Sequence, residues 1–206
     1  MTLSVFDLFT IGIGPSSSHT VGPMRAAKLF IDGLYQNGDL QNVCRIQVEL
    51  FGSLGATGGS HGSAKAVILG LLGQEPETVE VSKIDYKLRE VREKRRLILN
   101  NDRAIDFDEK TDLCMHRNSS LPFHPNGMKF SSYNNSGNVF TTKIYYSIGG
   151  GFVVDENAET QTKALKNQTH VPYPFSTGRQ LLDIVEKTGD SISSIMRKNE
   201  LTWRSK

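Results

Sequence analysis

The sequence is poor in cysteine, nearly balanced in charge and without a long hydrophobic run. Its two cysteines, Cys44 and Cys114, lie far apart and form no Cys-x-x-Cys pair, so they predict neither a disulfide framework nor a complete metal site. The formal net charge of +2 gives no argument for a nucleic-acid partner. No apolar run approaches the ~20 residues that span a membrane, and the first residues lack a secretory signal. We therefore expect a cytoplasmic protein with neither nucleic acid nor membrane as a partner.

The chain does contain enough apolar sequence for a packed core. Of its 206 residues, 37% are hydrophobic and 22% are charged, a balance typical of globular rather than disordered proteins. This length suits one large domain, or one domain with an appendage.

An unbroken row of polar side chains from Ser16 to Thr20 is the most informative stretch of the sequence. Buried hydroxyls need hydrogen-bonding partners, so such a row packs badly into a core. Glycines and prolines flank the row, and an apolar-periodic segment starts near Val21. We therefore expect these hydroxyls at a helix N-terminus, which suits a carboxylate or phosphate. His19 adds a group that can carry a proton at neutral pH. The simpler alternative is a capping loop without a ligand.

A second candidate site lies in the glycine-rich segment Gly52–Ser63, which we expect to be a loop between a strand and a helix. Ligands of α/β folds usually bind at such places, and glycines let the backbone approach a ligand closely. His61 lies just before the expected helix N-terminus, which favours the neutral imidazole that a general base needs. The alternative is a histidine that only fills a turn.

Two further segments are weaker candidates. Leu121–Gly127 presents His124 and Asn126 on a proline-bounded loop, and Ser147 precedes a run of three glycines after an expected strand. Each of these segments alone is more often an ordinary turn. His116 and His170 have no supporting context and are expected to be surface residues.

The apolar patterns predict an α+β or α/β fold, with a mixed or antiparallel sheet and helices packed against it. Helices are expected from about Val21 to a stop at Asn37-Gly38, over Ala64–Leu72 and over Ile84–Leu99. Strands are expected at Val43–Phe51, Val79–Val81, Ile105–Phe107, Leu113–Met115, Gly127–Tyr133, Val139–Tyr146 and Phe152–Val154.

The composition changes after Asp155. A polar, unpatterned stretch from Glu156 to Thr169 is expected to be a linker or exposed excursion. Two amphipathic helices should follow, the first capped by Ser176 and the second by Asp190. Two helices are too few to form a core alone, so we expect them to need a partner.

Four segments of this chain together are distinctive: Ser4–Phe9, Ile11–Met24 with its Ser-Ser-Ser-His-Thr row, Tyr145–Asp155 and Val171–Phe175. Taken together, and in this order, they closely resemble bacterial iron–sulfur L-serine dehydratases of the single-chain type. The resemblance runs essentially from end to end. It implies a β-domain over residues 1–155, a linker over 156–175 and the opening helices of a truncated α-domain over 176–206. That β-domain is similar to the allosteric substrate-binding domain of some phosphoglycerate dehydrogenases.

The resemblance also implies a reaction, the deamination of L-serine to pyruvate and ammonia. A [4Fe–4S] cluster with one open iron would bind the serine hydroxyl as a Lewis acid, while a base removes the Cα proton. On this reading His61 is the base and His19 its acid/base partner. The remaining candidates would hold the substrate carboxylate or border the same pocket: Ser16, Ser17, Ser18, Thr20, His124, Asn126 and Ser147.

The sequence departs from the family pattern in two ways. The family's cluster-binding cysteines lie in the remainder of the α-domain, and Cys44 and Cys114 match none of them. We therefore expect a piece of a longer, homodimeric enzyme that neither ligates a cluster nor turns over serine alone. In addition, Ser60 and Ala64 stand where the family commonly has a glycine and an aspartate around His61, so a carboxylate that would orient this histidine is missing.

The first hypothesis is that this chain supplies half of an enzyme active site, and two other functions are alternatives to it. One is a regulatory module that binds an amino acid or another carboxylate without chemistry, and the other is a structural dimerisation domain. The histidines favour the enzyme, because carboxylate capture needs hydroxyls and amides but no general base.

Overall fold

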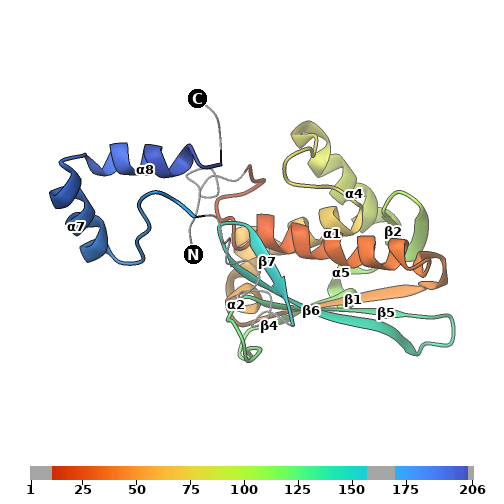
Figure 1. Cartoon of the computed structure of the whole chain (residues 1–206). Coiled ribbons are helices and arrows are strands. Elements are labelled where there is room, and N and C mark those ends of the chain that lie inside the picture. Colours follow the sequence, from red (N-terminus) through yellow and green to blue (C-terminus); the bar gives the residue numbers. More distant parts are fainter. Residues whose placement is uncertain (1–10, 157–169, 204–206) are drawn as a thin grey trace. The chain divides into compact units, whose positions relative to one another are not determined.

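The computed structural model describes residues 11–156 and 170–203, which belong to two separate units (Figure 1). The expectations for Ser4–Phe9 and for most of the linker, residues 157–169, lie outside the described residues.

A mixed five-stranded sheet organises residues 11–156. The strand order is β4-β1-β5-β6-β7, in which β1 and β4 run parallel and every other neighbouring pair runs antiparallel. The predicted α+β fold with a mixed sheet is therefore confirmed. The strands are β1 (Arg45–Phe51), β4 (Leu113–His116), β5 (Gly127–Tyr133), β6 (Val139–Gly149) and β7 (Phe152–Asp155).

One face of this sheet is covered by helix α1 (Val21–Gln36), which packs beside α3 (Ser63–Leu71) (Figure 1). Burial of apolar surface drives this packing, and the strands contribute every second residue to it. The Phe30 ring of α1, for example, lies 5.4 Å from the ring of Phe130 on β5. The buried residues of α1 recur at helical spacing, and those of β1 alternate: Met24, Ala27, Phe30, Ile31, Leu34, Ile46, Val48 and Leu50.

The segment Gly52–Ser63, expected as a loop, is instead largely helical. Helix α2 (Gly52–His61) follows β1 directly, and Gly62, with a φ of +83°, separates it from α3. Gly55 in this helix serves close packing rather than loop flexibility. A Cβ at Gly55 would lie 2.3 Å from the His116 carbonyl oxygen, so only glycine lets α2 sit this close to the sheet.

A small hairpin replaces the end of a predicted helix. Helix α4 (Ile84–Lys94) stops because Arg95 adopts the left-handed conformation, with a φ of +47°. The expected helix over Ile84–Leu99 is therefore wrong beyond Lys94. Strand β2 (Arg96–Leu99) pairs with β3 (Arg103–Asp106), and the other short elements are η2 (Leu40–Asn42), η3 (Val81–Lys83) and α5 (Glu109–Asp112). The expected strand Val79–Val81 is wrong, since η3 occupies its end.

The second unit contains helices α7 (Gly178–Thr188) and α8 (Ile192–Glu200). Their N-caps are Thr177 and Ser191, each one residue after the expected cap. The buried side chain of Asn199 binds the extended segment before α7: its amide donates to the Tyr173 carbonyl at 2.8 Å and its carbonyl accepts from the Tyr173 N–H at 2.9 Å.

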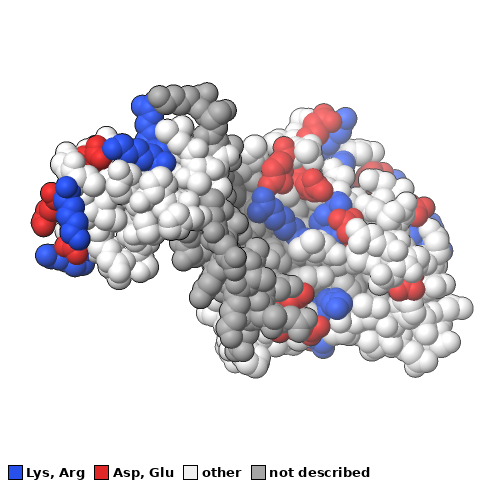
Figure 2. Space-filling view, in the orientation of Figure 1, with Lys and Arg blue, Asp and Glu red and all other residues white. Residues whose placement is uncertain are grey.

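Charges of both signs are interspersed over the face drawn in Figure 2, without one large region of either sign among the residues coloured there. Many charged side chains of the protein pair locally, such as Lys28 with Asp32 at 2.6 Å. Within residues 11–156 and 170–203, no helix has the length and apolar character needed to cross a bilayer.

Candidate functional site

The serine-rich row forms a turn that leads directly into α1, as the sequence predicts. The Ser16 carbonyl accepts from the N–H groups of His19 and Thr20, and the Ser17 carbonyl accepts from the Gly22 N–H. The N–H groups of Ser17 and Ser18 have no hydrogen-bond partner within the described part of the chain. Half-buried, unpaired N–H groups at the positive end of a helix suit an anionic group such as a carboxylate.

His19 is held on both of its ring nitrogens. Its Nδ1 lies 3.0 Å from Ser18 Oγ and 3.4 Å from Ser16 Oγ. Its Nε2 lies 3.2 Å from both Ser53 Oγ and Thr57 Oγ1 on α2. The imidazole therefore ties the serine turn to α2.

His61 lies at the C-terminal end of α2 and reaches the same place. Its ring centroid is 5.1 Å from that of His19. Its Nδ1 lies 2.9 Å from the Thr57 carbonyl oxygen and 3.3 Å from Ser60 Oγ. Helix α3 is also bound to the serine turn, because Ser63 Oγ donates to the His19 carbonyl at 2.8 Å. The two histidine-bearing segments thus converge, although His61 ends a helix instead of lying in the expected loop.

The surroundings of His19 lower its pKa. Burial of the ring, followed by the charge of neighbouring His61, lowers the pKa of His19 below 6.5, and a hydrogen bond involving Ser53 opposes the shift. Both causes favour a neutral His19 imidazole at neutral pH.

The third candidate segment lies beside α2. The Ser53 N–H donates to the Pro125 carbonyl at 3.0 Å, so the residue that holds His19 also holds the Leu121–Gly127 loop. Within this loop, Asn126 donates from its side chain to the Ser147 carbonyl at 3.1 Å and from its N–H to His124 Nδ1 at 3.1 Å. The structure therefore brings His124, Asn126 and Ser147 together, and their loop is held to α2 through Ser53.

Two of the predicted substrate-binding hydroxyls are buried. Thr20 is 2% exposed, and its Oγ1 donates to the Ser16 carbonyl at 2.7 Å, which shapes the turn. Ser147 is fully buried, and its Oγ has no hydrogen-bond partner in the described residues. That Oγ faces Gly22 in the first turn of α1, where a Cβ would lie only 2.0 Å away. Ser147 thus underlies the serine turn.

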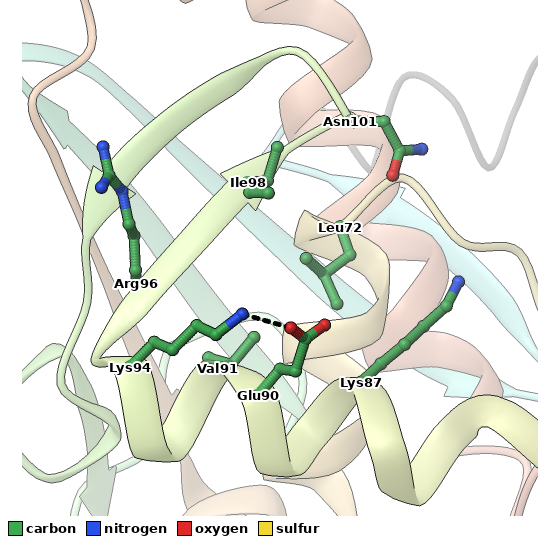
Figure 3. A pocket seen from close by; sticks show the side chains of 8 residues that line it. All are labelled: Leu72, Lys87, Glu90, Val91, Lys94, Arg96, Ile98 and Asn101. Atoms are coloured by element: carbon green, nitrogen blue, oxygen red, sulfur yellow. Dashed lines mark hydrogen bonds and ion pairs between the residues drawn. The ribbon is translucent and has the colours of Figure 1, made fainter.

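Other features lie outside this convergence. His116, expected as a plain surface residue, stacks on Phe51 and lies 3.0 Å from Glu49. Burial by itself raises the pKa of Glu49, but hydrogen bonds from Lys129 and His116 outweigh it and lower that pKa. A cavity of about 190 Å³ between α4 and β2 is lined by apolar side chains such as Leu72 and Val91 and by Lys94, which binds Glu90 (Figure 3). Lys87, also in its lining, donates to Gln74 at 2.7 Å. The cavity contains none of the candidate site residues.

Comparison with known proteins identifies the family. The family model described as the serine dehydratase beta chain matches residues 4–158. The chain belongs to this family. The resemblance to bacterial L-serine dehydratases is thereby confirmed. The L-serine dehydratase of Streptomyces coelicolor is 49% identical over 204 residues, which cover 99% of this chain and 45% of that protein.

Other relatives give the same result. L-serine dehydratase 1 of Escherichia coli is 46% identical over 205 residues, and the L-serine dehydratase of Mycobacterium tuberculosis is 42% identical over 205 residues. Each alignment covers 99–100% of this chain but 44% of the relative. The chain therefore spans less than half of the length of the L-serine dehydratases that it matches.

Inspection of the sequence missed two residues of the site, Ser53 and Thr57. Both contact His19, and Thr57 also contacts His61. The pattern that reveals them is the spacing Ser53–Thr57–His61, which places all three on one face of a helix. A loop has no such periodicity, so the residues did not stand out while the segment was expected to be a loop.

The residues that the structure describes do not fit an iron–sulfur cluster. Such a cluster is held by cysteine thiolates. Across residues 11–156 and 170–203, no group of three or more His, Cys, Asp or Glu side chains is arranged to hold a metal ion. The two free thiols have other contacts: Cys44 Sγ lies 3.8 Å from the Asn42 carbonyl, and Cys114 Sγ lies 3.7 Å from the Thr111 carbonyl.

Proposed function

We propose that this chain supplies one wall of the active site of an L-serine dehydratase, which converts L-serine to pyruvate and ammonia in the cytoplasm. In this proposal residues 1–155 are the β-domain, 156–175 the linker and 176–206 the opening helices of an α-domain. The observation that carries the proposal is the convergence of two histidines from separate segments, 5.1 Å apart, on a hydroxyl-rich turn at a helix N-terminus.

The serine turn is suited to hold the substrate carboxylate. Ser16, Ser17 and Ser18 are half-buried, and the N–H groups of the last two lack partners within residues 11–156. Hydroxyl and N–H donors at the start of α1 pair with a carboxylate without needing a cation. Thr20 keeps the turn in shape, and His124 and Asn126 border the pocket.

His61 is suited to take the Cα proton. Its Nδ1 faces the Thr57 carbonyl, while its Nε2 has no hydrogen-bond partner in the described part of the chain. As the Cα–H bond breaks, the proton passes to this nitrogen, and the electron pair forms the Cα=Cβ double bond while hydroxide leaves Cβ. The proton then passes from His61 to the hydroxide, which is released as water. The resulting aminoacrylate tautomerises to an imine, and water hydrolyses the imine to pyruvate and ammonia.

The cluster and the dimer belong to the longer proteins in this proposal. Because the described residues do not fit a [4Fe–4S] cluster, we assign its ligands to the additional polypeptide that the relatives contain. Of the groups that act in the reaction, this chain supplies the proton acceptor, His61. Partners are then L-serine, the α-domain and a second copy of the full-length enzyme.

A chimera tests the proposal. This chain replaces the matching N-terminal part of E. coli L-serine dehydratase 1, the cluster is loaded without oxygen, and pyruvate formation from L-serine is measured. We expect activity close to that of the parent enzyme. A folded, cluster-loaded chimera that forms no pyruvate contradicts the proposal. If this chain alone then binds L-serine in a calorimeter, the regulatory module is the correct alternative.

A further inference from the structure

We propose that Thr57 is a positioning residue that fixes His19 and His61 in opposite tautomers, so that His61 Nε2 is the ring nitrogen of the pair left free to accept a proton. This inference rests on the proposed function for its kinetic consequence, but the tautomers themselves are a property of this chain. The direction of each hydrogen bond fixes the tautomers, because a hydroxyl has one proton to donate and a carbonyl has none.

The first step concerns Nε2 of His19. Thr57 Oγ1 donates its proton to the Ser53 carbonyl at 2.9 Å, the i−4 contact usual for a threonine within a helix. That hydroxyl has no second proton to give. Towards His19 Nε2, at 3.2 Å, it therefore acts as an acceptor, and His19 Nε2 carries the hydrogen. Ser53 Oγ, also 3.2 Å from Nε2, can accept this same hydrogen.

The second step concerns Nδ1 of the same ring. A neutral imidazole with a hydrogen on Nε2 has its lone pair on Nδ1. Ser18 Oγ lies 3.0 Å from this nitrogen and can donate to it, with Ser16 Oγ at 3.4 Å as a second neighbour. Both nitrogens of His19 are then committed, one as a donor and one as an acceptor, so His19 has no free lone pair.

The third step gives His61 the opposite form. The Thr57 carbonyl oxygen, 2.9 Å from His61 Nδ1, can only accept, so Nδ1 carries the hydrogen. The lone pair is then on Nε2. Within residues 11–156 and 170–203 nothing is hydrogen-bonded to this nitrogen. Of the pair, His61 alone keeps a lone pair for a substrate proton.

This arrangement explains how His61 is oriented without a nearby carboxylate. Ala64 stands where the resemblance leads one to expect an aspartate, and the Thr57 carbonyl takes over the orienting contact. Because the hydroxyl and the carbonyl belong to one residue on a rigid helix, the two rings are held relative to each other as well as to the backbone. Small displacements of catalytic groups are costly, so this coupling matters for rate.

Nitrogen NMR on this chain tests the tautomers without any activity. Histidine side chains are labelled with ¹⁵N, and long-range proton–nitrogen correlations are recorded well above the ordinary histidine pKa of about 6.5. We expect His61 with its hydrogen on Nδ1 and His19 with its hydrogen on Nε2. In Thr57→Val, which keeps the carbonyl but loses the hydroxyl, His61 should be unchanged and His19 should show a mixture of both tautomers. The same tautomer on both wild-type rings, or His61 with its hydrogen on Nε2, overturns the proposal.

Kinetics in the chimera test the consequence. We expect Thr57→Val to lower kcat by about tenfold while KM stays within about twofold, and Thr57→Ser to restore most of the rate. Thr188→Val is the matched control, because Thr188 Oγ1 makes the same i−4 contact, with the Ile184 carbonyl at 2.8 Å in α7. An unchanged kcat in Thr57→Val, or an equal loss in the control, overturns the positioning role.

The two proposals fail in different ways. An inactive wild-type chimera removes the serine dehydratase proposal, and the NMR experiment still decides the tautomers. An active chimera in which Thr57→Val changes neither the His19 tautomer nor kcat removes the role of Thr57 alone.

Discussion

His19 and His61 are the same residue type, 5.1 Å apart, yet their surroundings differ in one respect. His19 has hydroxyl groups at both ring nitrogens, whereas His61 has contacts at Nδ1 only. A histidine with a ring nitrogen free of hydrogen bonds can accept a proton, whereas a histidine bonded at both nitrogens holds its neighbours in place. The residue type alone does not decide between these two roles. Changes in the two histidines test this contrast directly, and changes in the glycines that seat their helices test the scaffold that maintains it.

The largest effect is expected from removing the free imidazole. In the chimera, His61→Ala should lower kcat by about 10²–10⁴, because general-base catalysis contributes that much, while His19→Gln should lower it by only about tenfold. Steady-state pyruvate formation measures both. His170→Ala, a change of an exposed histidine in the second unit, is the control. A greater loss in His19→Gln than in His61→Ala reverses the assignment.

A smaller effect is expected on stability, from the glycines that seat the two helices. A Cβ at Gly55 would lie 2.3 Å from the His116 carbonyl oxygen, and backbone yields little, so Gly55→Ala should cost about 3 kcal/mol. A Cβ at Gly22 would lie 2.0 Å from Oγ and 2.7 Å from Cβ of the buried Ser147, and rotation of that side chain moves only its Oγ, so Gly22→Ala should cost about 2–3 kcal/mol. Gly33, in α1 with open space beside it, is the control, where alanine should stabilise by up to about 1 kcal/mol. Urea unfolding measures all three; equal costs at Gly55 and Gly33 contradict the packing argument.

The smallest effect is the pH dependence that His19 gives to folding. Its pKa is lowered in the folded state, so below about 6.5 the unfolded chain binds more protons. The stability that neutral His19 contributes is complete above about 6.5 and is lost as the pH falls through its lowered pKa. We expect the urea midpoint to fall less between about pH 7 and pH 5 in His19→Gln than in the wild type. Parallel pH curves for the two proteins contradict the lowered pKa.

The serine turn and α1 were predictable because their pattern is local. Apolar residues at helical spacing from Val21 onwards mark the helix, and the polar row before it cannot enter the core. The hairpin between β5 and β6 was predictable for the same reason, since its turn is rich in asparagine and glycine. The fold class, an α+β fold with a mixed or antiparallel sheet, was also predictable. The parallel pairing of β1 with β4 was not, because it depends on contacts between residues distant in sequence.

Helix α2 was not predictable from local pattern. Its glycines suggest a loop, whereas Gly55 is required by the approach of the sheet backbone, a contact between distant segments. The end of α4 is similar: leucine and isoleucine continue the helical spacing through Leu99, and only the backbone conformation of Arg95 reveals the stop. Ser53 and Thr57 were missed because their common face exists only once α2 is a helix.

Ser53 connects three stretches of sequence by different atoms. Its N–H donates to the Pro125 carbonyl, its carbonyl accepts from Thr57, and its hydroxyl contacts His19. Any exchange of residues 121–126 between relatives therefore also moves an imidazole that the exchanged loop does not contain. Laboratory evolution of substrate range should therefore vary this loop and position 53 together, because the effect of a change at either place depends on the residue at the other.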